Sequence, residues 1–166
     1  MMFQFDKILY CTDLSQGSNE CFKYAAFLAK KTGAEIHVLH VVEKLSSDAR
    51  MALESYVMNS EQRAEMLGSR KRQAKAKLET KQEDFWAQVS DPEDLAVRKQ
   101  IKSINIIESF PMEAILKNSR EREVDLIVMG THEKGFVETF LGSVARNVLA
   151  RSRIPVLVVP LKERKR

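Results

Sequence analysis

Short apolar runs alternate with segments of helical periodicity along most of this chain, and that alternation limits its fold more than any other feature. The runs rich in β-branched and other apolar residues are 7–11, 36–42, 104–107, 124–129 and 156–159. Strands that alternate with helices form α/β domains whose sheet is mainly parallel. At 166 residues the chain is long enough for one such core. We therefore predict a single α/β domain with a five-stranded, mainly parallel sheet and helices on both faces.

The helices are predicted from apolar side chains that recur at three- and four-residue steps. These segments are 17–31, which ends at Gly33, a long stretch within 61–90, 112–120 behind Pro111, and 144–151. No strand pattern occurs between residues 43 and 103. Residues 45–60 fit either a short helix or a loop, and this alternative stays open.

Charge and cysteine content indicate a setting but no activity. The chain has 27 basic and 23 acidic residues, and five of the basic ones lie at Arg70, Lys71, Arg72, Lys75 and Lys77. Such a run more commonly marks a solvated helix face than a nucleic-acid site. No apolar run approaches the roughly 20 residues of a membrane-spanning helix. With only two cysteines and no signal-peptide pattern, we expect a cytoplasmic protein without a membrane partner.

Glycines gather after the fourth predicted strand, where the chain enters the last helix. Gly130 follows that strand, and Gly142 and Ser143 precede the helix. Glycine lets the backbone approach a phosphate, Ser143 can cap the helix, and the first-turn amides carry partial positive charge. This pattern favours an anion site, although the glycines can equally serve only a tight connection. Neither the P-loop nor the dinucleotide-binding glycine motif is present.

Catalytic and metal-binding groups are harder to assemble. His37 and His40 are three apart on a strand, so they point to opposite faces and cannot chelate one ion. His132 sits in the glycine loop as a candidate phosphate contact, but no carboxylate is recognisably paired with it as a general base requires. Cys11 is more readily a packed apolar residue than a redox centre. We predict no metal of the protein's own and no catalytic residue, and leave open whether it is an enzyme.

Several ordered blocks resemble the universal stress proteins. They are KILYCTDLS at 7–15, LHVV at 39–42, VDLIVMGTH at 124–132, and LGSV at 141–144 followed by PVLVV at 155–159. The resemblance covers most of the chain and is weakest in the long helix of 61–90. It identifies residues 1–161 as a domain of this kind, with a long helical insertion at about 44–100 and a basic tail at 162–166.

This resemblance implies an adenine-nucleotide alpha-hydrolase-like fold of strand order 3-2-1-4-5, with ATP or AMP lying across the ends of the first and fourth strands. Asp13 matches the acidic residue that faces the adenine, and Val41 matches a residue that contacts the base. Asp13 can equally be a helix cap. The complete set of candidate cofactor-binding residues is Cys11, Thr12, Asp13, Val41, Met129, Gly130, His132, Gly142, Ser143 and Val144.

Two departures from the family pattern bear on the function. Glu133 replaces the second glycine of the loop, and only eight residues separate it from Gly142 where the family has nine. We therefore expect a stress-response module with a degenerate adenine-nucleotide site that acts by binding and not by catalysis. The resemblance also implies a homodimer through Val156–Val159, and its further protein partners are unknown. The alternatives are an ATP-binding protein with slow hydrolase activity and a nucleic-acid binder that uses the basic helix.

The first prediction concerns Glu133. A carboxylate there repels a polyphosphate and blocks the close backbone approach that glycine allows, so Glu133→Gly should tighten ATP binding. Equilibrium titration with ATP and AMP measures the change. Micromolar affinity in the native chain that Glu133→Gly leaves unaltered would contradict a blocked site.

Overall fold

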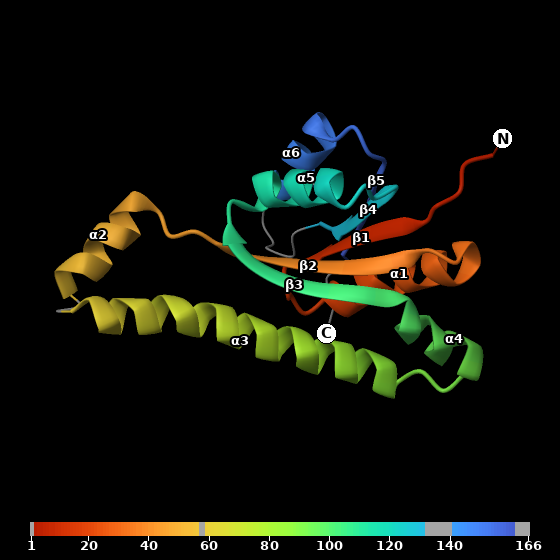
Figure 1. Ribbon diagram of the computed structural model, residues 1–166, viewed down its shortest axis with the longest axis horizontal. Coiled ribbons are helices and arrows are strands. Elements are labelled where there is room, and N and C mark those ends of the chain that lie inside the picture. Colours follow the sequence, from red (N-terminus) through yellow and green to blue (C-terminus); the bar gives the residue numbers. More distant parts are fainter. Residues whose placement is uncertain (1, 57–58, 132–140, 162–166) are drawn as a thin grey trace.

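The computed structural model describes residues 2–56, 59–131 and 141–161 and contains one parallel sheet. Its strands are β1 (Lys7–Thr12), β2 (Glu35–Glu43), β3 (Ile101–Ser109), β4 (Leu126–Gly130) and β5 (Val156–Val159). They pair in the order β3-β2-β1-β4-β5, with β1 at the centre (Figure 1). The predicted fold class and strand order are thus confirmed.

Helices cover both faces of this sheet. They are α1 (Ser18–Thr32), α2 (Ser47–Tyr56), α3 (Ser60–Ala87), α4 (Pro92–Ala96), α5 (Pro111–Glu121) and α6 (Ser143–Arg151), with a short 3₁₀ turn η1 (Val97–Gln100). In Figure 1, α1 and α3 lie on one face of the sheet, and α5 and α6 lie on the other. Among the described residues, no helix has the length and apolar character needed to cross a bilayer.

An aromatic cluster fastens the second half of α3 to the α1 face. The ring of Phe22 on α1 lies 5.0 Å from that of Tyr10 on β1 and 4.8 Å from that of Phe85 on α3. Trp86 packs edge-on against both phenylalanines, and Leu78 is buried beside them. These contacts anchor α3 only from Leu78 onward, because no residue of Ser60 to Lys77 is fully buried.

In two segments of the middle region, the structure either resolves an open alternative or corrects a predicted strand. Residues 45–60, left open between helix and loop, include the helix α2, which has no buried residue and extends with the start of α3 beyond the sheet (Figure 1). The predicted third strand, 104–107, is too short, since β3 begins at Ile101. Lys102 and Ser103 mask its start because an edge strand alternates polar and apolar residues and has no continuous apolar run.

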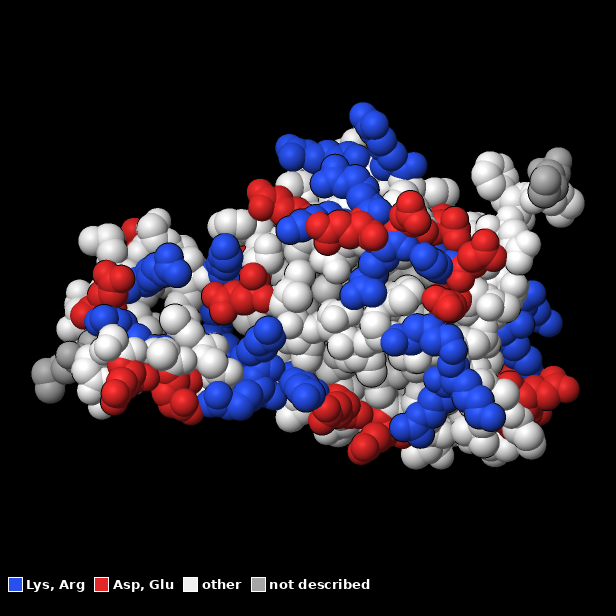
Figure 2. Space-filling view, in the orientation of Figure 1, with Lys and Arg blue, Asp and Glu red and all other residues white. Residues whose placement is uncertain are grey.

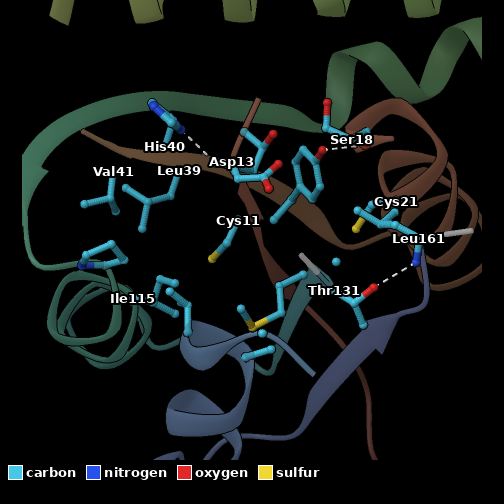
Figure 3. Close-up of a pocket in the computed structure, with 18 of the residues that line it drawn as sticks. Cys11, Asp13, Ser18, Cys21, Leu39, His40, Val41, Ile115, Thr131 and Leu161 are labelled. Carbon is cyan, nitrogen blue, oxygen red and sulfur yellow. Dashed lines mark hydrogen bonds between the residues drawn. The ribbon is translucent and has the colours of Figure 1, made fainter. Parts of the chain in front are cut away.

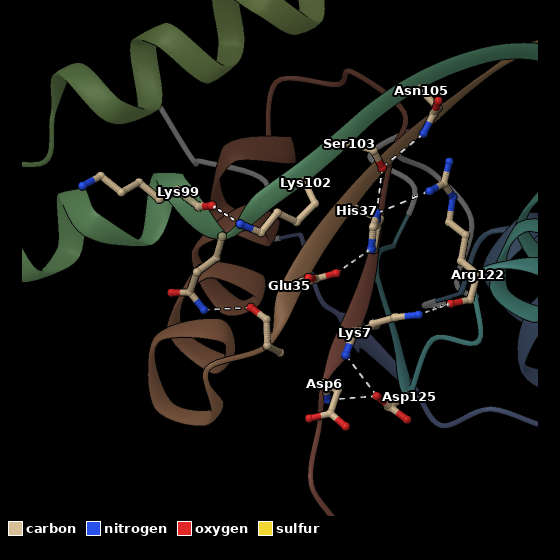
Figure 4. Close-up of polar contacts among 12 residues, drawn as sticks. Asp6, Lys7, Glu35, His37, Lys99, Lys102, Ser103, Asn105, Arg122 and Asp125 are labelled. Carbon is tan, nitrogen blue, oxygen red and sulfur yellow. Dashed lines mark hydrogen bonds and ion pairs between the residues drawn. The ribbon is translucent and has the colours of Figure 1, made fainter.

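Polar side chains connect the strands at the edge of the sheet where the amino-terminal ends of the strands lie. Asp125 Oδ2 accepts hydrogen bonds from the backbone N–H groups of Asp6 and Lys7 at 2.8 and 3.0 Å. His37 Nδ1 lies 2.7 Å from Ser103 Oγ, so this histidine joins β2 to β3 (Figure 4). The amino end of β1 is therefore fixed by a carboxylate from the loop that precedes β4.

Candidate functional site

The carboxyl ends of β1, β2 and β4 and the start of α6 enclose a cavity of about 390 Å³. Figure 3 shows Cys11, Asp13 and Val41 around it. Nine of the ten candidate residues line this cavity, although they come from four separate elements and loops: Cys11, Thr12, Asp13, Val41, Met129, Gly130, Gly142, Ser143 and Val144. The tenth, His132, lies outside the described residues, as does Glu133.

The turn after β1 is fixed by its own side chains. Thr12 Oγ1 accepts a hydrogen bond from the Leu14 N–H at 3.1 Å, and Asp13 Oδ1 accepts one from the Ser15 N–H at 2.9 Å. Leu14 adopts a left-handed backbone with φ of 60°, which costs roughly 1 kcal/mol in a non-glycine residue, and its buried side chain offsets that strain. The turn thereby holds Asp13 at the rim of the cavity.

Asp13 does not cap the following helix. The N-cap position of α1 is occupied by Gly17, and no side chain caps it. Asp13 lies four residues before Gly17, and its carboxylate accepts a hydrogen bond from the Ser15 N–H within the turn. Of the two roles that the sequence left open for Asp13, the helix cap is wrong. The carboxylate is exposed at the cavity instead.

His40 lines the cavity from β2, although the sequence indicated for it only that it shares no metal ion with His37. Its Nδ1 lies 2.7 Å from the Thr12 carbonyl oxygen, and because a carbonyl only accepts, Nδ1 carries the proton. Burial lowers the pKa of His40, opposed by the hydrogen bond to Thr12 and the charge of Asp13. His40 is therefore neutral at pH 7, with Nε2 as an acceptor. No group of three metal-ligating side chains occurs within the described parts of the chain.

The first turn of α6 presents backbone donors to the cavity. Gly142 is its N-cap residue and makes no side-chain hydrogen bond, and Ser143 is the first helical residue. The prediction that Ser143 caps this helix is therefore wrong. The first amides of a helix have no partner within it, and no described side chain caps them here, so N–H groups with partial positive charge border the cavity.

Gly130 has a packing role that the sequence did not reveal. A Cβ at this position would lie 2.9 Å from Leu161 Cδ1, closer than side chains tolerate. The Leu161 N–H also donates to Thr131 Oγ1 at 2.9 Å, which fixes the end of the described chain against β4. A side chain at residue 130 would therefore require Leu161 to shift.

The surroundings of the two cysteine thiols at the cavity keep them protonated and therefore unreactive. Burial raises the pKa of the Cys11 thiol far above its usual value, and burial together with the nearby Asp13 charge raises the pKa of Cys21 to about 12. Because the thiolate is the reactive form, neither sulfur is an effective nucleophile near neutral pH. This supports the interpretation of Cys11 as a packed residue.

Several lining residues were missed because they reach the cavity from distant segments. Pro111 and Ile115 come from the first turns of α5, Thr131 directly follows β4, and Leu161 lies just beyond β5. A signal for the first two was available, since the loop after β3 ends at the same edge of a parallel sheet as the loops after β1 and β4.

Comparison with known proteins assigns this arrangement to a family. Residues 4–160 match the sequence profile of the universal stress protein family. The chain belongs to the universal stress protein family. It is 31% identical over 170 residues to universal stress protein MJ0577 of Methanocaldococcus jannaschii, covering 98% of this chain and 99% of that protein. The solved structure of MJ0577 matches with a TM-score of 0.71 at 28% identity, over 97% of this chain and 99% of that one.

Two more distant structures share the universal stress protein fold. One is a universal stress protein in complex with cAMP, with a TM-score of 0.53 at 18% identity over 96% of this chain and all of that one. The other, from Archaeoglobus fulgidus, is in complex with dAMP and has a TM-score of 0.53 at 18% identity, over 95% of this chain and 99% of that one. At this identity the likeness establishes the fold alone.

The buried histidines predict how stability depends on pH. The pKa values of His37 and His40 are lowered in the folded protein, chiefly by burial, whereas in the unfolded chain they are about 6.5. Below that pH the unfolded chain therefore binds protons that the folded protein does not, and stability should fall between pH 6.5 and 5.5. The urea midpoint at pH 7.5, 6.5 and 5.5 measures this. His40→Gln should reduce the fall, and a midpoint that rises on acidification would refute the assignment.

Proposed function

We propose that this protein is a stress-response module that binds an adenine nucleotide in the cavity at the carboxyl ends of β1, β2 and β4. The observation that carries the proposal is the meeting of Asp13 and Val41, on one side, with the uncapped start of α6 on the other. An acidic acceptor and apolar groups suit a base and ribose, and free helix amides suit a phosphate. Members of the family with the same fold have been solved with cAMP and dAMP.

The ligand that fits this proposal best carries few phosphates. Glu133 opposes a polyphosphate by its negative charge. Because it replaces a glycine in a shortened loop, the close backbone approach that glycine permits is also lost. The cavity is near the lower end of the range for ligand sites. A mononucleotide such as AMP needs only the first turn of α6 for its phosphate. The site is thus degenerate toward ATP and retained for the smaller nucleotide.

The proposed action is binding without catalysis, in the cytoplasm. Cys11 and Cys21 are protonated thiols, and the Nδ1 proton of His40 is donated to the Thr12 carbonyl. Within the described lining, these side chains provide no activated nucleophile with a base beside it. Slow ATP hydrolysis is the competing function, and phosphate release above that of a heat-inactivated sample would favour it.

The edge strand β5 supports a homodimer. Pro155 and Val159 direct their carbonyl groups inward to the N–H groups of Ile127 and Thr131 on β4. Because backbone groups alternate in direction along a strand, Val156 and Val158 direct theirs away from the sheet. An apolar edge with unpaired backbone groups pairs readily with a second copy. We infer that two copies join through Val156–Val159.

The nucleotide site is tested by adding a negative charge at the start of α6. Ser143→Asp places a carboxylate beside the helix amides, where it should weaken AMP binding by about tenfold or more through charge repulsion. The same carboxylate complements the helix dipole, so unfolding stability should be unchanged or higher by about 0.3–1 kcal/mol. Calorimetric titration with AMP and thermal unfolding measure the two effects.

The matched control is Asn147→Asp, which adds the same charge to an exposed position on α6 outside the cavity lining. It should weaken AMP binding much less than Ser143→Asp does, because its carboxylate is exposed to solvent one helical turn farther from the amides. Adenosine, which lacks the phosphate, should bind wild type and Ser143→Asp alike. Equal AMP affinity in all three proteins would contradict the proposed site.

The dimer is tested at the outward N–H of β5. Val158→Pro removes that donor and leaves the inward ladder to β4 intact, so it should convert a dimer into a monomer. Val158→Ala keeps the donor and should remain dimeric. Light scattering over a range of concentrations distinguishes the states, and a wild-type protein that is monomeric at every concentration would remove this part of the proposal.

A further inference from the structure

A second cavity, of about 400 Å³, adjoins the nucleotide cavity on the side of α3. We call it the α3 cavity. The two cavities share His40, Val41 and Glu43 of β2 and Asp13 of the turn after β1. The opposite wall of the α3 cavity consists of Arg70, Gln73, Ala74 and Lys77. It is thus bounded by the strand ends and by the helix that resembles the family least.

Three of the four residues that α3 contributes, all except Ala74, are polar where a packed helix would be apolar. Positions 70, 73, 74 and 77 follow helical spacing and form one face. Farther along the helix, Leu78, Phe85 and Trp86 bury that side against the sheet. Lysine and arginine side chains gather over the middle of α3 in Figure 2. Beyond the strand ends, therefore, the inner face of α3 carries positive charge over a cavity.

Arg70 is held in place but is incompletely bonded. Its Nη2 donates to the Glu43 carbonyl oxygen at 2.8 Å, which fixes the guanidinium at the end of β2. Its Nη1 is buried and has no hydrogen-bond partner among the described residues. A buried charged donor without an acceptor is costly, so a ligand oxygen that reached this N–H group would stabilise it. The guanidinium fork matches a phosphate in particular.

The cationic side chains of this wall form no close ion pair. In the described part of the chain, no ion pair joins Arg70 or Lys77 to an acidic side chain. The carboxylates of Asp13 and Glu43 also border the cavity and repel an oxyanion, so a bound phosphate would lie on the α3 side, next to Arg70 and Lys77. The charge of Lys77 reaches across to His40 and helps to lower its pKa. Two cations thus face the α3 cavity from one helix.

We propose that the α3 cavity is a second oxyanion site, in which Arg70 and Lys77 bind a phosphate group next to the nucleotide. Two sources supply that chemistry. One is a second phosphate on the ligand in the nucleotide cavity, and this case rests on the proposed function. The other is a free phosphate ion, which binds whether or not a nucleotide does.

The experiment separates the two sources by calorimetric titration with AMP, adenosine 3′,5′-bisphosphate and inorganic phosphate. The variants are Arg70→Met, Arg70→Lys and Lys77→Met, and the control is Lys75→Met, which removes the same charge from an exposed position of α3 outside the cavity. Circular dichroism and thermal unfolding of each variant confirm the fold, which the core from Leu78 onward should preserve.

If the second phosphate belongs to the nucleotide, the bisphosphate should bind wild type about tenfold tighter than AMP. Arg70→Met and Lys77→Met should remove that advantage, Arg70→Lys should retain part of it, and Lys75→Met should keep it. If free phosphate is the ligand, phosphate alone should bind wild type and lose about tenfold in the same two variants. Either pattern supports the oxyanion site.

The proposal is overturned if neither phosphate nor the second phosphate of the bisphosphate gains affinity from Arg70 and Lys77, or if Lys75→Met has the same effect as Lys77→Met. Its failure is distinct from failure of the proposed function. If no nucleotide binds but phosphate binding still depends on Arg70, only the proposed nucleotide site is refuted. If AMP binds all four variants equally, the bisphosphate has no advantage and phosphate does not bind, only the α3 site is refuted.

Discussion

Parallel pairing of β1 with strands on both sides is the constraint on which the rest of the molecule depends. Cys11 is opposite Leu39 on β2 and Met129 on β4, so three strand ends meet at one edge of the sheet. At the other end, Asp125 holds the first amides of β1 and sets where the strand begins. Asp13 therefore leaves the sheet between the ends of β2 and β4, and residues from both of these strand ends border the cavity beside it.

Periodicity was sufficient for the elements of the fold but not for their ends. Strands such as Glu35–Glu43 are recognisable in the sequence because both of their faces are covered, which makes most of their residues apolar. The edge strand β3 lacks that covering, and its first residues read as polar. The two caps were misassigned for a related reason. Asp13, Gly17, Gly142 and Ser143 are all acceptable N-cap residues, and only the path of the chain decides which one occupies the position.

The candidate site was predictable to the extent that it follows strand ends. Resemblance to the family named nine residues that the structure brings to one cavity, but it could not find His40, Leu161 or Arg70. Each of these depends on a contact between distant segments. Arg70 reaches the carbonyl of Glu43 across 27 residues, and Leu161 packs on Gly130 from the far end of the last strand. Local sequence patterns cannot predict such contacts between distant segments.

The long helix α3 separates stability from binding along its length. Its second half contributes Leu78, Phe85 and Trp86 to the core, where loss of one large side chain costs about 2–5 kcal/mol. Its first half buries no residue completely, and so the identities of its side chains are little constrained by packing. A helix anchored at one end can therefore change the residues that it holds over the strand ends without unfolding the domain. Arg70 and Lys77 occupy that permissive part, beside the strand ends that border both cavities.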